Sequence, residues 1–429
     1  MRIAAKTTTI LRQAAFRCGQ LGKTTSTPPK MSRPAASSAS STMNLDSYAV
    51  HSKNQYAAHA LTRNLLSGSM ERLAKRCKLE DIASISSGSP LRRRHIIDLG
   101  SADGTSTMET LRFAVRRLND GAGAPTPLRV TFEEHPASDE AKLRASLDGH
   151  RGWFAAEDVT WDVRMQSFYE PLFEPESVDF MMSYICLHWL DTTDVSDGGD
   201  ISDWKTLGAA GTTAGGGASR LDWVHVNEPG VPPSVRERWR TDLADAHLGK
   251  FLALRAGELR PGAEMVIVMV GCPHEYVSPS DGGQSPLTRA MKRCIERGEL
   301  RSEILDRTTV PYFLRTPKDI ETALAVASDL EMGDSTRRRP GALLEMVNCE
   351  LIQTMTRGED GDVLGGAFDL YWSIHSNAVE AAGPTAEESD RVRAEARRVF
   401  DEIYDGEVGI PTSFVACTFR RRTREPWAP

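Results

Sequence analysis

The residues with the clearest capacity for chemistry form the run His95-Ile-Ile-Asp98-Leu-Gly100-Ser-Ala-Asp103-Gly104. An apolar pair leads into Asp98, two glycines follow, and an amphipathic run begins at Met108. This order predicts a strand, a tight turn and the start of a helix, whose first N–H groups are free to bind an anion. Because glycine also lets the backbone approach a ligand closely, we expect a nucleotide-like cofactor at this turn.

The glycine spacing separates two kinds of nucleotide cofactor. A dinucleotide-binding turn carries three glycines in the pattern GxGxxG, whereas this turn reads Asp-x-Gly-x-x-x-Gly. The pattern suits S-adenosylmethionine better, because its amino-acid end needs N–H donors and an acidic acceptor such as Asp98. Glu134, at the end of the next predicted strand, is placed to accept the two ribose hydroxyls. A nicotinamide oxidoreductase is disfavoured, and a ligand-free strand–turn–helix is the alternative.

The front of the 429-residue chain differs in charge from the rest. No acidic residue precedes Asp46 and seven basic residues do, so the first 45 residues carry +7 and the remainder −14. A segment rich in Ala, Ser, Thr and Arg without acids is typical of a transit peptide, which predicts a mitochondrial or plastid protein, or otherwise a cytoplasmic one. The acidic remainder disfavours nucleic-acid partners, which select basic surfaces.

The cysteines and the apolar runs exclude two further classes of protein. The cysteines are scattered and include no Cys-x-x-Cys pair, which disfavours a disulfide framework and a zinc site; they stand at positions 18, 77, 186, 272, 294, 349 and 417. The longest apolar run, 265–270, is far shorter than the roughly 20 residues of a membrane helix. We therefore expect no membrane partner and a reducing compartment.

Strand-like and helix-like stretches alternate through the first two thirds of the chain. Strands are expected near 95–99, 128–132, 159–164, 177–185 and 264–270, and helices within 48–77, 108–118, 137–147 and 233–259. This alternation predicts an α/β fold with a doubly wound parallel sheet. Beyond it the pattern is helical without clear strands until 413–419, which predicts a strand that returns to the sheet. The expected organisation is a disordered targeting segment (1–43), a core (44–275) with a flexible insertion (191–220), a helical cap (276–405) and a C-terminal strand segment (406–429).

Several short motifs occur in a fixed order and carry a resemblance to a known family. They are Tyr48…Ser52-x-x-Gln55, Asp98-Leu-Gly100-x-x-x-Gly104, Ser167-Phe168-Tyr169, Leu187-His188-Trp189-Leu190, Pro232-Pro233-Ser234, Phe251-Leu252-x-x-Arg255-x-x-Glu258 and Val310-Pro311-Tyr312. From about residue 46 to 421 the chain resembles the SABATH carboxyl methyltransferases, which methylate salicylate, benzoate, jasmonate, indole-acetate and related acids. The resemblance implies a Rossmann-like S-adenosylmethionine-dependent methyltransferase core with a helical cap.

The resemblance also implies roles for single residues. Ser52 and Asp98 would contact the methionine part of the cofactor, and Ser167 and Phe168 its adenine end. The full set implied for cofactor binding is Tyr48, Ser52, Asp98, Gly100, Asp103, Glu134, Ser167 and Phe168. Gln55 and Trp189 would bind the substrate carboxylate, and His188 would lie beside Trp189 in the same wall.

These residue types suit methyl transfer to a carboxylate. A carboxylate is already ionised at neutral pH, so the reaction needs orientation more than a strong base. One oxygen must lie about 3 Å from the sulfonium methyl and in line with the departing sulfur. The amide of Gln55 and the indole of Trp189 are neutral N–H donors that can hold the other oxygen. The expected partner is a small, mostly apolar carboxylic acid, and the product its methyl ester.

At several positions the chain differs from the plant members, so the resemblance does not identify which acid is the substrate. Plant members have Tyr-Ser where this chain has Ile185-Cys186, Ser-Ser where it has Ala102-Asp103, and Asn-Asp where it has Glu133-Glu134. Two alternatives remain: an N-methyltransferase of a purine-like molecule, and an inactive member that only binds a ligand. The resemblance allows a magnesium ion near the cap, for which the sequence offers no ligand set, and a homodimer, because plant members often pair through one face of the core.

Overall fold

The computed structural model describes residues 58–123, 125–191, 223–273, 284–332, 343–356, 363–404 and 410–423. The expected targeting segment, residues 1–43, lies outside these ranges. So does the expected insertion, of which only Asp191 is described.

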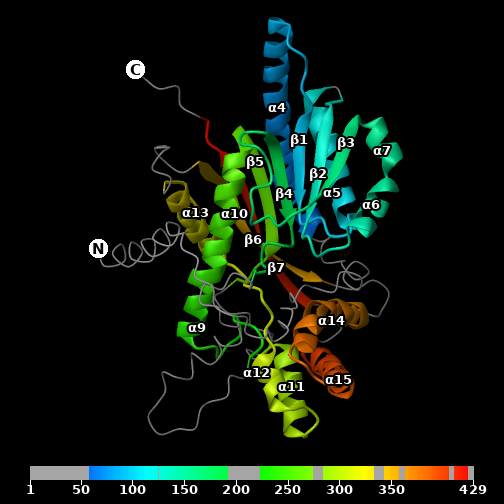
Figure 1. Ribbon diagram of the computed structural model, residues 1–429, viewed down its shortest axis with the longest axis vertical. Coiled ribbons are helices and arrows are strands. Elements are labelled where there is room, and N and C mark those ends of the chain that lie inside the picture. Colours follow the sequence, from blue (N-terminus) through cyan, green and yellow to red (C-terminus); the bar gives the residue numbers. More distant parts are fainter. Residues whose placement is uncertain are drawn as a thin grey trace, which may run out of the picture. The chain divides into compact units, whose positions relative to one another are not determined.

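Seven strands form one mixed sheet (Figure 1). They are β1 (Arg94–Leu99), β2 (Leu128–Glu134), β3 (Val159–Met165), β4 (Val178–Tyr184), β5 (Leu259–Val270), β6 (Leu344–Thr356) and β7 (Ile410–Arg421). Their order across the sheet is β3-β2-β1-β4-β5-β7-β6. The first five strands are parallel, whereas β7 runs antiparallel to both β5 and β6.

The strand order creates a switch point in the middle of the sheet. The chain passes from β1 outward to β2 and β3, and then returns to β4 on the other side of β1. The connections that follow β1 and β4 therefore leave in opposite directions, which opens a crevice at the carboxyl ends of these strands where ligands of α/β proteins bind. The loops after β1 and β4 are the two that border it.

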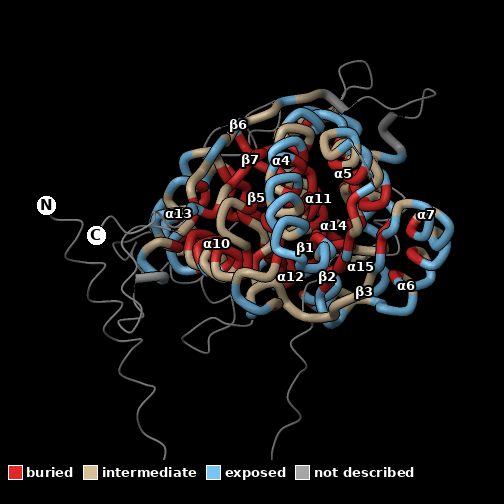
Figure 2. The backbone as a smooth tube through the Cα atoms, turned by 90° about the horizontal axis from the view of Figure 1, so that it is seen from above, coloured by how far each residue is buried: buried red, intermediate tan, exposed pale blue. Residues whose placement is uncertain are grey.

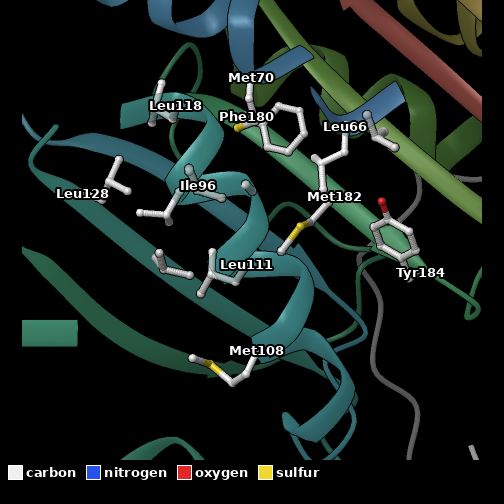
Figure 3. Close-up of a cluster of buried hydrophobic side chains, with 14 of the residues drawn as sticks. Leu66, Met70, Ile96, Met108, Leu111, Leu118, Leu128, Phe180, Met182 and Tyr184 are labelled. Carbon is white, nitrogen blue, oxygen red and sulfur yellow. The ribbon is translucent and has the colours of Figure 1, made fainter. Parts of the chain in front are cut away.

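Helices cover both faces of the sheet, so the central strands are buried on both sides (Figure 2). One face is covered by α4 (Arg63–Ser87), α5 (Thr105–Ala122), α6 (Glu140–Asp148) and α7 (Arg151–Ala156). On this side Leu66 and Met70 of α4, Leu111 of α5, and Ile96 and Phe180 of the sheet form one apolar core (Figure 3). The opposite face packs against α10 (Ala246–Glu258) and α13 (Pro317–Met332).

The helical run predicted at 233–259 is confirmed, with one irregularity. It begins as α9 (Pro233–Arg238), passes through a π-helical segment (Trp239–Asp245), and continues as α10. Pro233 suits the first turn, where an N–H group has no partner in the helix. No helix in the described part of the chain combines the length and the apolar character that a membrane crossing requires.

The remaining helices gather beyond one end of the sheet, at the lower side of Figure 1. They are α11 (Pro286–Glu296), α12 (Ser302–Arg307), α14 (Val363–Ala381) and α15 (Ala386–Ile403). Their apolar side chains form clusters of their own: Leu287 and Met291 of α11 pack with Val379 of α14 and Val392 of α15. A capping box from Thr385 and Glu388 fixes the start of α15.

The prediction that residues 276–405 contain no strand is wrong, because β6 lies within them. The strand expected at 413–419 is present as β7 and pairs with β6 along its whole length. β6 escaped detection because its register shifts between Met346 and Asn348, which leaves Val347 exposed and interrupts the alternation of apolar and polar residues. As the outermost strand it is also rich in polar residues.

Candidate active site

The loop between β1 and α5 bends through three residues with positive φ angles. These are Gly100 (φ 77°), Ala102 (φ 52°) and Gly104 (φ 78°). The sequence analysis anticipated the two glycines; Ala102 takes a conformation that an alanine adopts only when its surroundings hold it there. Asp103 contributes to the turn, since its carboxylate accepts a hydrogen bond from the Thr105 N–H (3.0 Å) at the start of α5.

Asp98 lies buried beneath this loop and is hydrogen-bonded only to hydroxyl groups among the residues described. Its Oδ2 accepts from Ser101 Oγ (2.6 Å) and Thr107 Oγ1 (2.9 Å). Burial raises the pKa of Asp98 to about 6, against the effect of these two bonds. Asp98 therefore fixes the turn from inside, and its predicted contact with a cofactor stays a prediction.

Two adjacent glutamates of β2 bind the same loop. Glu133 Oε2 accepts from the Gly100 N–H (3.0 Å), and Glu134 Oε2 accepts from the Ala102 N–H (2.5 Å). Burial, reinforced by the charge of Glu134, raises the pKa of Glu133 well above its usual range. Glu133 Oε1 is buried and has no hydrogen-bond partner in the described structure. The sequence predicts a ribose contact for Glu134 and none for Glu133.

The loop after β4 touches the loop after β1. A Cβ atom on Gly100 would lie 2.7 Å from the Cys186 sulfur, so only glycine permits this close approach. Ile185, directly after β4, has a φ of 59°, which is strained for a β-branched residue. Such strain persists where neighbouring contacts enforce it, and it is concentrated at functional sites.

Trp189 and His188 extend from this loop toward the segment before α13. An antiparallel bridge joins Trp189 to Tyr312, and the Phe313 N–H donates to the His188 carbonyl (2.9 Å). Trp189 is partly exposed, and its indole N–H makes no hydrogen bond within the described part of the chain. His188 is buried; burial and the charge of Arg315 lower its pKa to about 3, so its ring is neutral at physiological pH.

Arg315 holds the loop after β4 from below, and sequence reasoning missed it. Its side chain is fully buried and donates to the Leu187 carbonyl (2.8 Å) and to the Ala244 carbonyl (2.7 Å). Ala244 belongs to the π-helical segment, and a side chain bonded to a helix carbonyl is one cause of such a disturbed helix. Positions 187 and 315 are far apart in the sequence, so no local pattern marks this contact.

The segment after β3 carries the two residues predicted for the adenine end. Ser167 Oγ accepts from the Tyr169 N–H (3.2 Å), and Phe168 packs edge-on against Tyr169 and Phe251. The Tyr169 hydroxyl donates to the Trp189 carbonyl (3.3 Å). The structure thereby links the predicted cofactor segment to the predicted substrate segment.

A buried ion pair on α10 fixes the position of the Ser167–Phe168 segment. Arg255 donates to the carbonyls of Phe168 (3.0 Å) and Glu170 (2.8 Å) and pairs with Glu258. Glu258 in turn accepts from the Leu172 N–H (2.6 Å). The spacing of Arg255 and Glu258 places both on one helix face, which is the sequence signal for their joint role.

An array of aromatic rings continues from Trp189 into the helices beyond the sheet. Tyr312 stacks on His225 (ring centroids 4.7 Å apart), and His225 meets His375 of α14 edge-on (4.9 Å). His375 Nδ1 lies 2.6 Å from the Tyr371 carbonyl, so this nitrogen carries the proton. Burial lowers the pKa of His375 to about 4, which leaves Nε2 as a buried acceptor without a partner in the structure as described.

Three predicted site residues, Tyr48, Ser52 and Gln55, lie outside the described residues. The other eight lie at the carboxyl ends of β1 to β4, either in the last residues of a strand or on the loop that follows it: Asp98, Gly100, Asp103, Glu134, Ser167, Phe168, His188 and Trp189. Within the described ranges, no group of three His, Cys, Asp or Glu side chains is arranged to hold a metal ion.

No family model matches the chain, but the chain is similar in sequence to known plant proteins. It is 26% identical to indole-3-acetate O-methyltransferase 1 of Arabidopsis thaliana over 301 residues, which cover 64% of this chain and 69% of that protein. It is 23% identical to gibberellic acid methyltransferase 2 of the same plant over 307 residues, which cover 67% and 70% of the two chains.

A solved structure shares the fold. Loganic acid methyltransferase with SAH superposes with a TM-score of 0.57 at 16% identity, over 83% of this chain and 95% of that one. The mixed sheet described above is accordingly an α/β Rossmann-like sheet with the same fold as that methyltransferase. This chain is therefore similar in sequence to two plant carboxylic-acid methyltransferases and in fold to a third.

Proposed function

We propose that this chain is an S-adenosylmethionine-dependent carboxyl O-methyltransferase that converts a small carboxylic acid into its methyl ester. The observation that carries the proposal is the position of Trp189. This residue is partly exposed, and its indole offers an unengaged N–H donor at the switch point, beside the glycine turn. The names of the relatives, which specify indole-acetate, gibberellic acid and loganic acid, support an acid as the acceptor.

The chemical types of the residues at the switch point suit S-adenosylmethionine. The carboxyl groups of Asp98, Glu133 and Glu134 gather there without a hydrogen-bonded basic partner in the described part of the chain, which favours a cationic ligand. Glu133 Oε1 is a buried acceptor in need of a donor, such as a ribose hydroxyl. When bound, this cofactor supplies an electrophilic methyl group attached to sulfur.

The chain's own contribution is orientation of the acid. The backbone of Trp189 is held by the bridge to Tyr312 and by the Tyr169 hydroxyl, so the point from which its indole projects is fixed. A donor fixed in this way can hold one carboxylate oxygen and direct the other toward the methyl group. His188 is neutral, so it does not form an ion pair with the substrate carboxylate that would draw the acid away from the positively charged cofactor.

Methyl transfer from labelled S-adenosylmethionine to a panel of indolic, aromatic and terpenoid acids tests the proposal. We expect a labelled product that mild alkali hydrolyses, because methyl esters are base-labile. Trp189→Phe should lower kcat/KM, because the transition state loses about 2–4 kcal/mol of stabilisation when one well-placed donor is removed. Gln55→Ala should have an effect of similar size.

Trp153→Phe is the matched control, because Trp153 lies on α7 away from the switch point and should leave kcat/KM unchanged. Full activity in both Trp189→Phe and Gln55→Ala would contradict the proposed orientation. A base-stable product would instead indicate methylation of a ring nitrogen. Cofactor binding by calorimetry without turnover of any acid would indicate a protein that only binds its ligands.

A further inference from the structure

Two cysteines face each other across the antiparallel strands at one edge of the sheet. Cys349 of β6 stands directly opposite Cys417 of β7 in the ladder. Their sulfur atoms are 2.7 Å apart, and both are free thiols. No other two of the described cysteines contact each other in this way. Neither belongs to the candidate active site.

The backbone geometry of this pair already suits a covalent bond. Residues directly opposite in an antiparallel ladder have Cα atoms about 4.5–5.5 Å apart. Bridged cysteines have Cα atoms about 4.4–6.8 Å apart, so the two ranges overlap. A disulfide between Cys349 and Cys417 would therefore require rotation of side chains and no movement of the strands.

We propose that Cys349 and Cys417 form a reversible disulfide by exchange with an oxidised low-molecular-weight disulfide. The Cys349 thiolate attacks one sulfur of that molecule, and its first thiol leaves. The Cys417 sulfur then attacks Cys349 in the mixed disulfide, and the second thiol leaves with the proton that Cys417 loses. Two protein thiols are oxidised, and one small disulfide is reduced to two thiols.

The environments of the two thiols determine the order of these steps. Cys349 is only partly buried and belongs to β6, which is the outermost strand and pairs on one side only. Cys417 is fully buried in the neighbouring strand. The hydrogen bond from Cys417 lowers the pKa of the Cys349 thiol, whereas burial raises that of Cys417. Cys349 is therefore the thiol that an external disulfide meets first.

The disulfide would close a loop that contains two complete helices. The chain leaves β6 at Thr356, forms α14 and α15, and enters β7 at Ile410. A bond between Cys349 and Cys417 would tie together the two strands on which this helical pair is rooted. Since α14 carries His375 of the aromatic array, oxidation would act on a helix that ring contacts connect to Trp189. The proposal does not depend on methyl transfer.

Peptide mapping of the full-length protein after equilibration in mixtures of glutathione and glutathione disulfide tests the proposal. Free thiols are blocked with an alkylating reagent, and the protein is digested without reduction. We expect one linked peptide pair that joins Cys349 to Cys417, two hydrogen atoms lighter than the separate peptides and cleaved by dithiothreitol. The thermal midpoint should be higher for the oxidised than for the reduced protein, because the bond restricts the unfolded chain.

Cys349→Ser should remove both the linked peptide and the oxidation-dependent change in thermal midpoint. Cys294→Ser, at another buried free thiol, should retain both. Mapping of the unaltered protein needs no variant and stays decisive if a variant fails to fold. Absence of the linked pair at every glutathione ratio, or glutathione retained on Cys349 as a stable mixed disulfide, would overturn the proposal.

Discussion

Three carboxyl groups determine the electrostatics of the candidate active site. Asp98 and Glu133 are buried, and Glu134 lies beside them at the end of β2. Their hydrogen-bond partners in the described residues are hydroxyl and backbone N–H groups, which stabilise negative charge less than a basic side chain does. Burial raises the pKa values of Asp98 and Glu133, and these hydrogen bonds offset that effect only in part.

Asp98→Asn should change how stability depends on pH. The pKa of Asp98 is about 6 in the folded protein against a usual 3.8, so between these values the folded state keeps a proton that the unfolded state loses. Stability contributed by Asp98 therefore falls as pH rises from about 4 to 6, by roughly 3 kcal/mol in total. Urea unfolding at pH 4 and pH 8 measures the free energy of unfolding of both proteins. The difference between Asp98→Asn and the natural protein should favour the variant more at pH 8 than at pH 4. Equal differences at both pH values would contradict the shift; Asp103→Asn is the control in the same loop.

Binding of S-adenosylmethionine should release protons near pH 6. The positive sulfonium favours the ionised form of Asp98 and so lowers its pKa. Calorimetry in buffers of different ionisation enthalpy measures this release directly. S-adenosylhomocysteine, whose sulfur is uncharged, should release fewer protons, and Asp98→Asn should reduce the difference between the two ligands. The same release for both ligands would place the sulfonium away from Asp98.

The helices on one face of the sheet fix the positions of the segments that follow β3 and β4. α10 holds the segment after β3 through Arg255 and Glu258, and the π-helical segment holds the loop after β4 through Arg315. Each contact ends on a backbone carbonyl or N–H group, so the position of the loop depends little on its own side chains.

Arg255→Met should destabilise the protein by about 3–5 kcal/mol, because it leaves the Glu258 carboxylate buried without its partner. The double variant Arg255→Met/Glu258→Leu should recover part of this loss, since it removes both charges. Urea unfolding measures both effects, and KM for S-adenosylmethionine should rise in Arg255→Met as the Phe168 segment shifts. A double variant less stable than the single one would show that the ion pair itself stabilises the fold.

The sequence predicted those parts of the fold that local patterns encode. β4 is buried throughout and contains the apolar run Phe180–Met182, and the Gly100–Gly104 turn was located from its glycines. β6 was missed because a register shift interrupts its alternation. Arg315 was missed because its partners are distant in sequence, and Glu133 because strand position alone does not tell which of two adjacent acids is buried.

The whole sheet depends on β7, the last of the described elements. It lies between β5 and β6, and both pair with it in antiparallel register. Its buried side chains contribute to the apolar cores on both faces, since Phe414 and Ala416 point to one and Val415 and Phe419 to the other. β7 therefore contributes to the apolar packing on both faces of the sheet.

Removal of residues 410–429 should abolish cooperative folding. Loss of the buried apolar side chains of β7 amounts to on the order of 10 kcal/mol, which is comparable with the total stability of a typical protein. Gel filtration and urea unfolding should show aggregated or unfolded material, because β5 and β6 would expose unpaired edges. Removal of residues 424–429 alone is the control and should leave the transition unchanged. A cooperative transition in the longer truncation would contradict this role.

The position of β7 has a consequence for the nascent chain. While the ribosome is still synthesising residues before 410, the parallel strands can pair, but β5 has no neighbour on its open side and β6 has no partner at all. The helices α11 to α15 must emerge before the sheet that supports them is complete. For most of its synthesis the polypeptide thus presents two open strand edges, a state in which chaperones protect chains from aggregation.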